Sequence, residues 1–394
     1  MRFWPRAGGA LVRVVFGLAT GLATGLTGGP AGAQALLDFT PDERALIFAH
    51  GPWPPPPAAD LSNRVQTQPA AIDFGRTLFF ERRLSTDGNV ACASCHRPEL
   101  AFQDGLPVAQ GATAGLRNTP SLLDAAQRRW LGWDGAHDSL WAASVTPLVA
   151  RREMAASPAQ IAATVRREAG LALAYRAAFG VMPRPDDEAL LVNLGKALAA
   201  YQATLVSGRT PFDDFRDALL RGDPAAASRY PQPAQRGLRL FIGAGRCHVC
   251  HAGPSFTNGE FADVGLPHFV PGGVDGGRYD GLTRLRVSPL NRLGPHNDAG
   301  VADPRAVTTR HVQALHRNFG EFRVPGLRQL VHTAPYMHNG SLARIEDVVR
   351  HYSELDEERL HSDGERILRP LKLSPAQADD LAAFLRSLSS PSAR

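Results

Sequence analysis

The stretches CASCH, residues 92–96, and CHVCH, residues 247–251, decide the fold of this chain. Each has two cysteines three positions apart followed at once by a histidine, which is the attachment signature of c-type haem. Two thiols at this spacing can each form a thioether with one vinyl group on the same porphyrin edge, and the histidine then places an imidazole under the iron. We therefore expect two covalently bound haem c groups, attached through Cys92, Cys95, Cys247 and Cys250 and ligated by His96 and His251.

Paired thiols also occur in disulfides, redox dithiols and zinc ribbons. The two halves of a zinc ribbon usually lie about 15–20 residues apart. Here 155 positions separate Cys92 from Cys247, and each pair has its own histidine. An exported protein with four cysteines would often form two disulfides. A disulfide or a redox dithiol therefore stays open as the alternative to haem attachment.

Residues 1–33 have the three parts of a secretory signal peptide. The segment begins with positive charge, continues with an apolar stretch at residues 14–26, and ends with an Ala-Gly-Ala site. The apolar stretch is too short to cross a bilayer, which needs about 20 residues. We expect cleavage after Ala33 and a periplasmic mature protein with no membrane anchor. The positive charge comes from Arg2, Arg6 and Arg13.

The composition indicates a globular protein. Of the 394 residues, 44% are hydrophobic and 21% are charged. No apolar run reaches the roughly 18 residues of a membrane span, which excludes a multi-span membrane protein. The formal charge of +5 falls to +2 without the three arginines of the signal segment, because 40 basic residues then face 38 acidic ones. So small an excess gives little support for a nucleic-acid partner.

The chain looks internally duplicated around the two motifs. A G-x-x-L-F pattern precedes each motif, at residues 75–79 and 237–241. An F-x-[D/N]-G pattern follows each motif, at residues 102–105 and 256–259. We expect the leucine and phenylalanine of the first pattern to pack against the porphyrin. The duplication predicts two haem domains, which we place at residues 34–226 and 227–394.

Most of the chain is expected to form helices and loops, with no series of β-strands that would build a sheet. The sequence S-P-A-Q occurs at residues 157–160 and 374–377. It is typical of a helix N-cap, a proline in the first turn and a capping-box glutamine. A further helix is predicted from the apolar spacing of Leu191, Leu194, Leu198 and Tyr201.

Five further motifs accompany the two haem motifs. They are RNTPS at residues 117–121, WDG at 133–135, EM at 153–154, FRVPGLR at 322–328 and TAPYMHNGSL at 333–342. Together, these motifs resemble those of the bacterial di-haem cytochrome c peroxidases and their MauG-like relatives, over nearly all of the chain after the signal segment. The resemblance implies an all-α fold, with two cytochrome-c-like helical domains, long ordered loops, and haems that face a shared interface.

The resemblance implies that the N-terminal haem, with His96 as its proximal ligand, is the peroxide site. In ordinary di-haem peroxidases a histidine in the following loop caps the iron until the enzyme is reduced, but residues 106–115 contain none. An open, five-coordinate iron, as in the MauG-like branch, is the natural inference. Glu153, 20 positions after Trp133, matches the family's distal acid–base residue. Ala143 stands where the family often has a second distal residue, a glutamine.

Glu153 and Trp133 each have a functional and a structural interpretation. Cleavage of an O–O bond needs a proton moved from the inner to the outer oxygen, and a carboxylate of raised pKa can relay it. Without the resemblance, Glu153 would be interpreted as a surface residue paired with Arg151 or Arg152. Trp133 matches an aromatic that the family places between the haems, where an oxidisable indole could relay electrons. Its alternative is a core tryptophan.

The second haem has His251 as its proximal ligand, and the resemblance points to its other side. Di-haem peroxidases supply a methionine from the helix after the P-Y-x-H-[D/N]-G segment. At the matching position, 14 residues past His338, this chain has Tyr352, the feature that separates MauG-like enzymes from peroxidases. A phenolate stabilises high-valent iron, whereas methionine stabilises the reduced state. Met337 and His351 are rival ligands, and a buried tyrosine with a hydrogen-bonded hydroxyl is the structural alternative.

Asn118, Thr333 and Pro335 match the family's inter-domain calcium ligands, the last two through their backbone carbonyls. Oxygen ligands with few carboxylates suit a calcium ion completed by water. Taken alone, Asn118 and Thr333 would be interpreted as loop caps. The calcium ion is therefore implied by the resemblance.

Three functions compete. The first is a MauG-like di-haem oxidase, which uses hydrogen peroxide at the first haem and draws the oxidising equivalents, through Trp133, from a protein or other donor. The second is a cytochrome c peroxidase, which reduces peroxide with electrons from a small cytochrome. The third is a non-enzymatic di-haem electron carrier, which would need two six-coordinate irons and no distal acid. The missing loop histidine, Glu153 and Tyr352 favour the first. The oligomeric state, monomer or homodimer, stays open.

Overall fold

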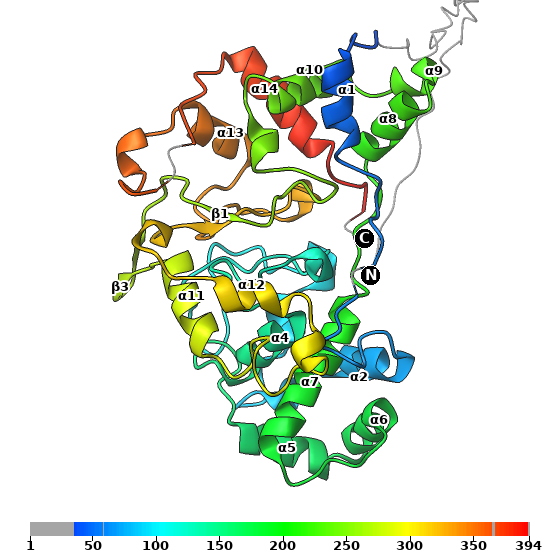
Figure 1. Ribbon diagram of the computed structural model, residues 1–394, viewed down its shortest axis with the longest axis vertical. Helices are drawn as coiled ribbons and strands as arrows, with labels where there is room; N and C mark the ends of the chain where they lie inside the picture. Colours follow the sequence, from blue (N-terminus) through cyan, green and yellow to red (C-terminus); the bar gives the residue numbers. More distant parts are fainter. Residues whose placement is uncertain (1–34, 58, 365–366, 393–394) are drawn as a thin grey trace, which may run out of the picture. The chain divides into compact units, whose positions relative to one another are not determined.

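The structure is a computed structural model that describes residues 35–57, 59–364 and 367–392 (Figure 1). The expected signal peptide, residues 1–33, lies outside the described residues. Within them the chain is mostly helical, as the sequence predicts, and none of these helices is long and apolar enough to span a membrane. The α-helices are α1 (Pro41–Phe48), α2 (Pro69–Phe79), α3 (Cys92–Cys95), α4 (Leu140–Val149), α5 (Pro158–Arg167), α6 (Ala169–Phe179), α7 (Asp187–Gln202), α8 (Pro211–Leu220), α9 (Pro224–Ala227), α10 (Gln232–Ile242), α11 (Arg278–Val287), α12 (Ala306–His311), α13 (Ile345–Ser353) and α14 (Pro375–Arg386).

The strands are short and make no layer of the fold. Strand β1 (Phe261–Ala262) pairs antiparallel with β4 (Phe322–Arg323), and β2 (Phe269–Val270) pairs antiparallel with β3 (Gly273–Val274). Each strand has two residues. In the described part of the chain there is therefore no strand series that builds a sheet, which agrees with the sequence prediction.

Helices α5 and α14 both begin with the N-cap serine and the first-turn proline of the S-P-A-Q pattern. The capping-box glutamine is confirmed in α14 and is wrong for α5, where the Gln160 side chain donates to the carbonyl oxygens of Ser85 and Thr86. The Ser157 hydroxyl accepts a hydrogen bond from the backbone N–H of Gln160, and the Ser374 hydroxyl accepts one from the N–H of Gln377. A proline occupies the first turn of both helices. These caps satisfy N–H groups that have no partner inside the helix. The predicted apolar stripe lies on α7, where Leu191, Leu194 and Leu198 are buried.

Buried apolar side chains form two main clusters. The first cluster draws on residues 65–200 and is built mainly by α2, α4, α5, α6 and α7. The second draws on residues 39–47 and 212–388, and α1, α8, α10, α13 and α14 supply most of it. The segment before α2 therefore packs with the helices of the second cluster. The chain begins in the second cluster, forms the first cluster with residues 65–200, and then returns to the second.

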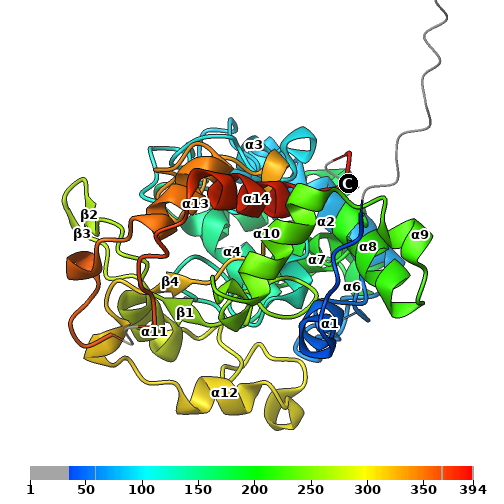
Figure 2. The same cartoon turned by 90° about the horizontal axis from the view of Figure 1, so that it is seen from above.

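Each cluster contains a close crossing of two helices near its haem motif. Helix α2 packs on α7, and α10 packs on α14 (Figures 1 and 2). A methyl group at Gly75 would lie 1.9 Å from the carbonyl oxygen of Ala197, so only glycine permits the first crossing. A methyl group at Gly237 would lie 1.9 Å from the carbonyl oxygen of Asp380 in the second. The glycine of the G-x-x-L-F pattern is thus a helix contact point in both halves of the duplication.

The aromatic packing repeats as well. The Phe79 ring lies 6.1 Å from the Phe102 ring, and the Phe241 ring lies 6.0 Å from the Phe256 ring, both edge to face. All four side chains are buried. Each pair joins the helix before a haem motif to the turn after it, so the duplication in the sequence is also present in the packing.

Candidate active site

The two haem motifs have the same local geometry. The first lies on α3, and the second begins with the 3-10 helix η4 (Cys247–Val249). Nδ1 of His96 forms a 3.0 Å hydrogen bond with the carbonyl oxygen of Phe102, and Nδ1 of His251 forms a 3.0 Å bond with that of Phe256. Such a bond fixes the ring orientation and leaves Nε2 as the nitrogen for a metal.

The turns after the motifs supply these carbonyls. Phe102 has φ 59° and Phe256 has φ 53°, in the left-handed region that bulky residues rarely adopt. The glycines that end the two patterns, Gly105 and Gly259, also have positive φ. The F-x-[D/N]-G pattern is thus a strained turn that aims a carbonyl at the motif histidine, and such strain is typical of functional sites.

All four motif thiols are free. Burial raises the pKa of Cys92 and of Cys247 to about 12 and that of Cys95 to about 11. The pKa of Cys250 is raised for the same reason. A redox dithiol needs a thiol of lowered pKa. The raised pKa values therefore argue against a redox dithiol, and no disulfide joins the four cysteines.

The loop at residues 106–115 packs against the turn that carries Glu153. The N–H of Ala112 donates to the carbonyl oxygen of Glu153 over 2.7 Å. The Sγ of Cys95 lies 3.6 Å from the carbonyl oxygen of Gln110 in the same loop. The structure therefore brings together the first motif, the loop that lacks a histidine, and the predicted distal acid.

Glu153 is an exposed residue beside the first motif. It keeps access to solvent, yet the protein packed around it raises the pKa of its carboxyl by desolvation. Its charge in turn contributes to the raised pKa values of Cys92 and Cys95. Among the ion pairs of the described residues, none joins Glu153 to a neighbouring arginine. Arg152 instead donates to the carbonyl oxygen of Ala114 over 2.8 Å.

A cavity of about 1010 Å³ surrounds the second motif. Its volume matches the upper end of the range for small-molecule and cofactor sites, about 300–1,000 Å³. The two thiols of the motif and His251 form part of its wall. Six further predicted site or rival residues come to the same wall or rim: Trp133, Tyr352, Met337, Asn118, Thr333 and Pro335.

Tyr352 and its rivals are placed differently. Nε2 of His351 forms a 2.8 Å hydrogen bond with the carbonyl oxygen of Val264, which turns that imidazole toward the chain and not toward the cavity. Tyr352, the next residue of α13, lines the cavity, and burial raises the pKa of its phenol above the usual range. Met337 also lines the cavity. Tyr352 and Met337 therefore share the cavity with His251, whereas His351 does not.

Trp133 is held between segments that follow the two motifs. Its indole N–H donates to the carbonyl oxygen of Asn118 over 2.8 Å, and the N–H of Asn118 donates to the carbonyl oxygen of His338 over 2.7 Å. The guanidinium of Arg323 lies 5.7 Å from the indole centre. Burial lowers the pKa of Arg323 to about 9, which still leaves the group charged at neutral pH.

The predicted calcium ligands all line the cavity of the second motif. The side-chain amide N–H of Asn118 donates to the carbonyl oxygen of Leu106 over 2.8 Å. This bond leaves the amide oxygen of Asn118 available to a cation. Thr333 and Pro335 lie in the segment whose His338 carbonyl is bonded to Asn118, so sequence-distant oxygen donors are brought to one region.

Sequence reasoning missed the buried charges that hold these segments. Arg117 forms ion pairs with Asp134 at 2.5 Å and with Asp275 at 2.7 Å. Arg328 forms two hydrogen bonds with Asp213, at 2.8 and 2.9 Å, and both side chains are nearly fully buried. Both arginines belong to motifs that carry the family resemblance, and this membership is the one sequence feature that could have pointed to them. Their partners, up to 158 positions away, could not be found without the fold.

Comparisons with known proteins agree with this geometry. Residues 69–222 match the family model described as di-haem cytochrome c peroxidase. MauG of Methylorubrum extorquens is 34% identical over 322 residues, which cover 81% of this chain and 78% of that protein. This chain belongs to the di-haem cytochrome c peroxidase and MauG family. A cytochrome-c peroxidase of a Pseudomonas species is 32% identical over 357 residues, 86% of each protein.

Solved structures of di-haem peroxidases have the same fold. The diheme peroxidase BthA from Burkholderia thailandensis has a TM-score of 0.66 and 25% identity, covering 82% of this chain and 87% of that chain. A MauG-like protein associated with microbial copper homeostasis has a TM-score of 0.65 and 27% identity, covering 87% of this chain and 97% of that chain. The present di-haem peroxidase is therefore a haem-dependent enzyme with peroxidase or oxidase chemistry.

Membership of the family implies two haem c groups, and the residues fit them. Each site offers two free thiols and an imidazole whose Nδ1 is already bonded to a backbone carbonyl. The second site adds a cavity of suitable volume. Cys92, Cys95 and His96 would hold the first group, and Cys247, Cys250 and His251 the second.

Proposed function

We propose that this di-haem peroxidase is a MauG-like enzyme of the periplasm that consumes hydrogen peroxide at the site of His96. Its oxidising equivalents are drawn from a protein or other donor. Its haem domains are proposed at residues 34–226 and 227–394, with α1 and α8 of the first range packed in the second apolar cluster. The observation that carries the proposal is Tyr352 on the wall of the His251 cavity, where the resemblance places a methionine in plain peroxidases. The loop at residues 106–115, which has no histidine, supports it independently.

Glu153 is proposed to move the proton. The haem supplies a redox-active iron at which peroxide can be reduced, and reduction of one peroxide to two waters takes up two electrons and two protons. The Glu153 carboxylate accepts the proton of one peroxide oxygen and returns it to the other. Its pKa, raised by desolvation, suits both halves of this transfer. Ala143 offers no hydrogen bond there, so Glu153 would act without a second distal residue.

Trp133 is proposed as the aromatic relay between the two sites. Its N–H bond to Asn118 fixes the indole plane, and its place on the cavity wall supports contact with the second site. The nearby charge of Arg323 disfavours a cationic indole. This makes loss of an electron from Trp133 harder and favours its rapid return.

Tyr352 is proposed as the distal ligand at the second site. A phenolate bound to ferric iron is a hard anion, and it would lower the reduction potential of that site relative to methionine. The raised pKa of the phenol means that proton loss from Tyr352 depends on the positive charge of the metal. Met337, on the same cavity, is the competing ligand.

The calcium site is part of the same proposal. The amide oxygen of Asn118 and the carbonyl oxygens of Thr333 and Pro335 are neutral donors of the type that calcium accepts together with water. A cation there would join the loop after the first motif to the segment that precedes His338. Chelation of calcium should then weaken electron transfer between the sites without releasing haem, because the haems are attached through thioethers.

A plain cytochrome c peroxidase is the second candidate. It is favoured by the cytochrome-c peroxidase of a Pseudomonas species, whose similarity to this chain equals that of MauG within two per cent identity. The two functions differ in what peroxide does to the fully oxidised protein. A plain peroxidase needs partial reduction first, because a capping ligand must leave its peroxide site.

The deciding experiment is electron paramagnetic resonance of the ferric holoprotein, with and without one equivalent of peroxide. The proposal predicts one high-spin and one low-spin haem, whose signals disappear within the mixing time without prior reduction. Two low-spin signals that respond only after partial reduction would establish the plain peroxidase instead. Two low-spin signals that ignore peroxide in every redox state would leave an electron carrier.

A further inference from the structure

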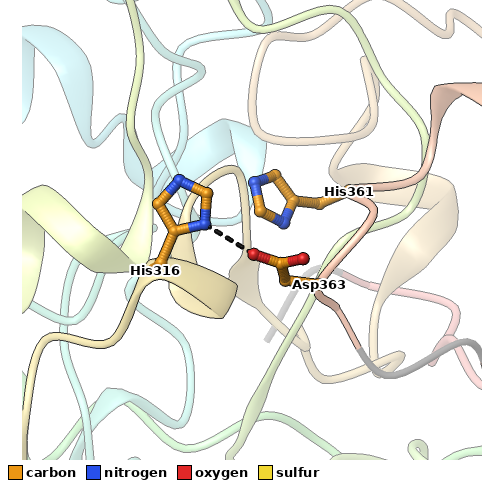
Figure 3. Close-up of side chains that lie close together, drawn as sticks. All are labelled: His316, His361 and Asp363. Carbon is orange, nitrogen blue, oxygen red and sulfur yellow. Dashed lines mark hydrogen bonds and ion pairs between the residues drawn. The ribbon is translucent and has the colours of Figure 1, made fainter.

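Three metal-binding side chains meet at a place that the haem chemistry does not use. His316 begins the 3-10 helix η6 (His316–Asn318), and His361 and Asp363 lie in the turn that follows the 3-10 helix η8 (Glu357–Arg359). One donor atom from each lies within 4.8 Å of the other two. Nδ1 of His316 and a carboxylate oxygen of Asp363 are 2.8 Å apart (Figure 3). Figure 3 also shows a ring nitrogen of His361 turned toward Asp363.

Hydrogen bonds hold the backbone near the three side chains in place. The N–H of His361 donates to the Asp263 carboxylate over 2.7 Å, and the N–H of Gly364 closes the turn on the carbonyl of His361 over 3.1 Å. The His361 ring also packs at 6.0 Å from the Phe319 ring. The donors are therefore largely preorganised, which lowers the entropic cost of binding an ion.

One donor has no partner inside the protein. Nδ1 of His361 is buried, and among the described residues nothing forms a hydrogen bond with it. A buried polar atom left unsatisfied is unfavourable, and such exceptions in native structures often mark an ion or an ordered water. His316 and Asp363 are exposed, so an ion has a route to the site from solvent.

The donor chemistry selects the class of ion. Imidazole nitrogen suits zinc, copper and nickel, whereas calcium and magnesium take oxygen donors. Two histidines and one carboxylate with a water in the fourth position is an established zinc geometry. We propose that His316, His361 and Asp363 bind a divalent first-row transition-metal ion, with zinc as the reference ion.

The location gives the site a structural consequence. Leu315, Arg317 and Asn318 line the cavity of the second haem motif, and so do Leu360 and His361. A bound ion would join these two segments, which are 45 positions apart between His316 and His361. The ion would thereby hold the two segments together at the rim of the His251 cavity and keep them from moving apart.

The test is isothermal titration of zinc chloride into the metal-free holoprotein, with both haems attached. His316→Gln and Asp363→Asn remove donors from exposed positions and leave the core untouched. His311→Gln is the matched control, because it removes an exposed histidine five positions away. We expect one saturable site in the wild-type protein and in the control. Each donor variant should bind zinc at least ~10-fold more weakly, the lower end of losses seen when metal-site residues are changed.

Zinc K-edge absorption of the loaded holoprotein gives a readout that does not depend on activity. It should show a nitrogen and oxygen shell at about 2.0–2.1 Å with imidazole scattering. Wild-type zinc affinity in both donor variants, or an equal loss in His311→Gln, would overturn the proposal. So would a wild-type titration with no saturable site. An unchanged haem spectrum and circular dichroism in the variants show that the loss is local.

Discussion

The indole N–H of Trp133 donates to the backbone carbonyl of Asn118 at 2.8 Å. Asn118 is at the same time bonded to Leu106 through its side chain and to His338 through its N–H. The tryptophan is therefore oriented by a residue that touches both the loop after the first motif and the wall of the second cavity. This links the geometry of the proposed relay to the segments that surround both sites.

Replacement of Trp133 by phenylalanine should separate the two sites electronically. We expect donor-dependent turnover to fall by roughly tenfold or more, a barrier increase of about 1.4 kcal/mol. The initial reaction with peroxide at the Glu153 site should keep its rate. Stopped-flow measurement of both steps in the holoprotein tests this. Trp130→Phe is the control, because Trp130 is a buried tryptophan that stacks with Arg278. Equal losses in both variants would mean that Trp133 has only a packing role.

Glu153→Gln should disable the proton transfer. It keeps the shape of the side chain but cannot cycle a proton, so peroxide consumption should fall by about 10²–10⁴-fold. Haem content and spectra of the ferric protein should not change. Glu99→Gln, which alters an exposed glutamate paired with Arg97 near the same motif, should retain full activity. A glutamine variant that consumes peroxide at the wild-type rate would remove Glu153 from the mechanism.

The pH profile of peroxide consumption follows from the same carboxyl. Desolvation raises the pKa of Glu153, and the form that accepts a proton is the carboxylate. Activity should therefore be present above the raised pKa and decline as the pH falls through it. The midpoint of this decline should lie above the usual glutamate pKa of about 4.3. The profile of kcat/KM between pH 4 and 8 measures this limb. This acidic decline should be absent in Glu153→Gln. A decline that persists in the variant would belong to another titrating group.

Tyr352→Met should convert the second site toward that of a plain peroxidase. Thioether ligation raises the reduction potential relative to phenolate, within the span of about 0.8 V that axial ligands command. Potentiometric titration and the ferric spectrum of the second haem report this directly. Tyr336→Phe removes a hydroxyl from the same cavity, where it bonds the carbonyl of Leu330, and should leave the potential unchanged. If Met337→Leu shifts the potential while Tyr352→Phe does not, Met337 is the ligand.

The glycines at the helix crossings should be sensitive to a single methyl group. Gly75→Ala and Gly237→Ala place a Cβ against a backbone carbonyl that cannot move without parting two helices. We expect each to lower the free energy of unfolding by about 1–3 kcal/mol. Gly170→Ala, in open space on α6, should be neutral or stabilise by up to ~1 kcal/mol. Denaturant unfolding of the holoproteins measures all three, and equal stabilities would contradict the proposed role of the crossings.

Local patterns in the sequence were sufficient for much of the fold. The cap at Ser374 and the stripe on α7 depend on neighbours within a few positions, so composition and spacing determine them. The motif duplication at Gly75 and Gly237 was also visible, although its physical reason, a contact with a distant helix, was not. Periodicity reports which face is buried but not which helix covers it.

In the candidate site, too, some residues could be predicted from local sequence and others could not. The motif cysteines and histidines follow from one chemical signature, whereas Glu153 and Tyr352 were reached only through family resemblance. The pairs Arg117–Asp275 and Arg328–Asp213 join positions 158 and 115 residues apart, and nothing local identifies these partners. The orientation of His351 toward Val264 was equally beyond the sequence, because it depends on where a loop passes.

The crossing of α10 with α14 sets an order in which the two halves can close. Helices α2 and α7 both precede the second haem motif in the sequence, so the first half needs no residue beyond Gln202 to form its helix crossing. The partner of α10 is α14 (Pro375–Arg386), so the second half can close only after residue 386 is present. A message truncated before α14 would therefore yield a protein with one finished half and one exposed apolar helix face, a ready substrate for quality-control proteases.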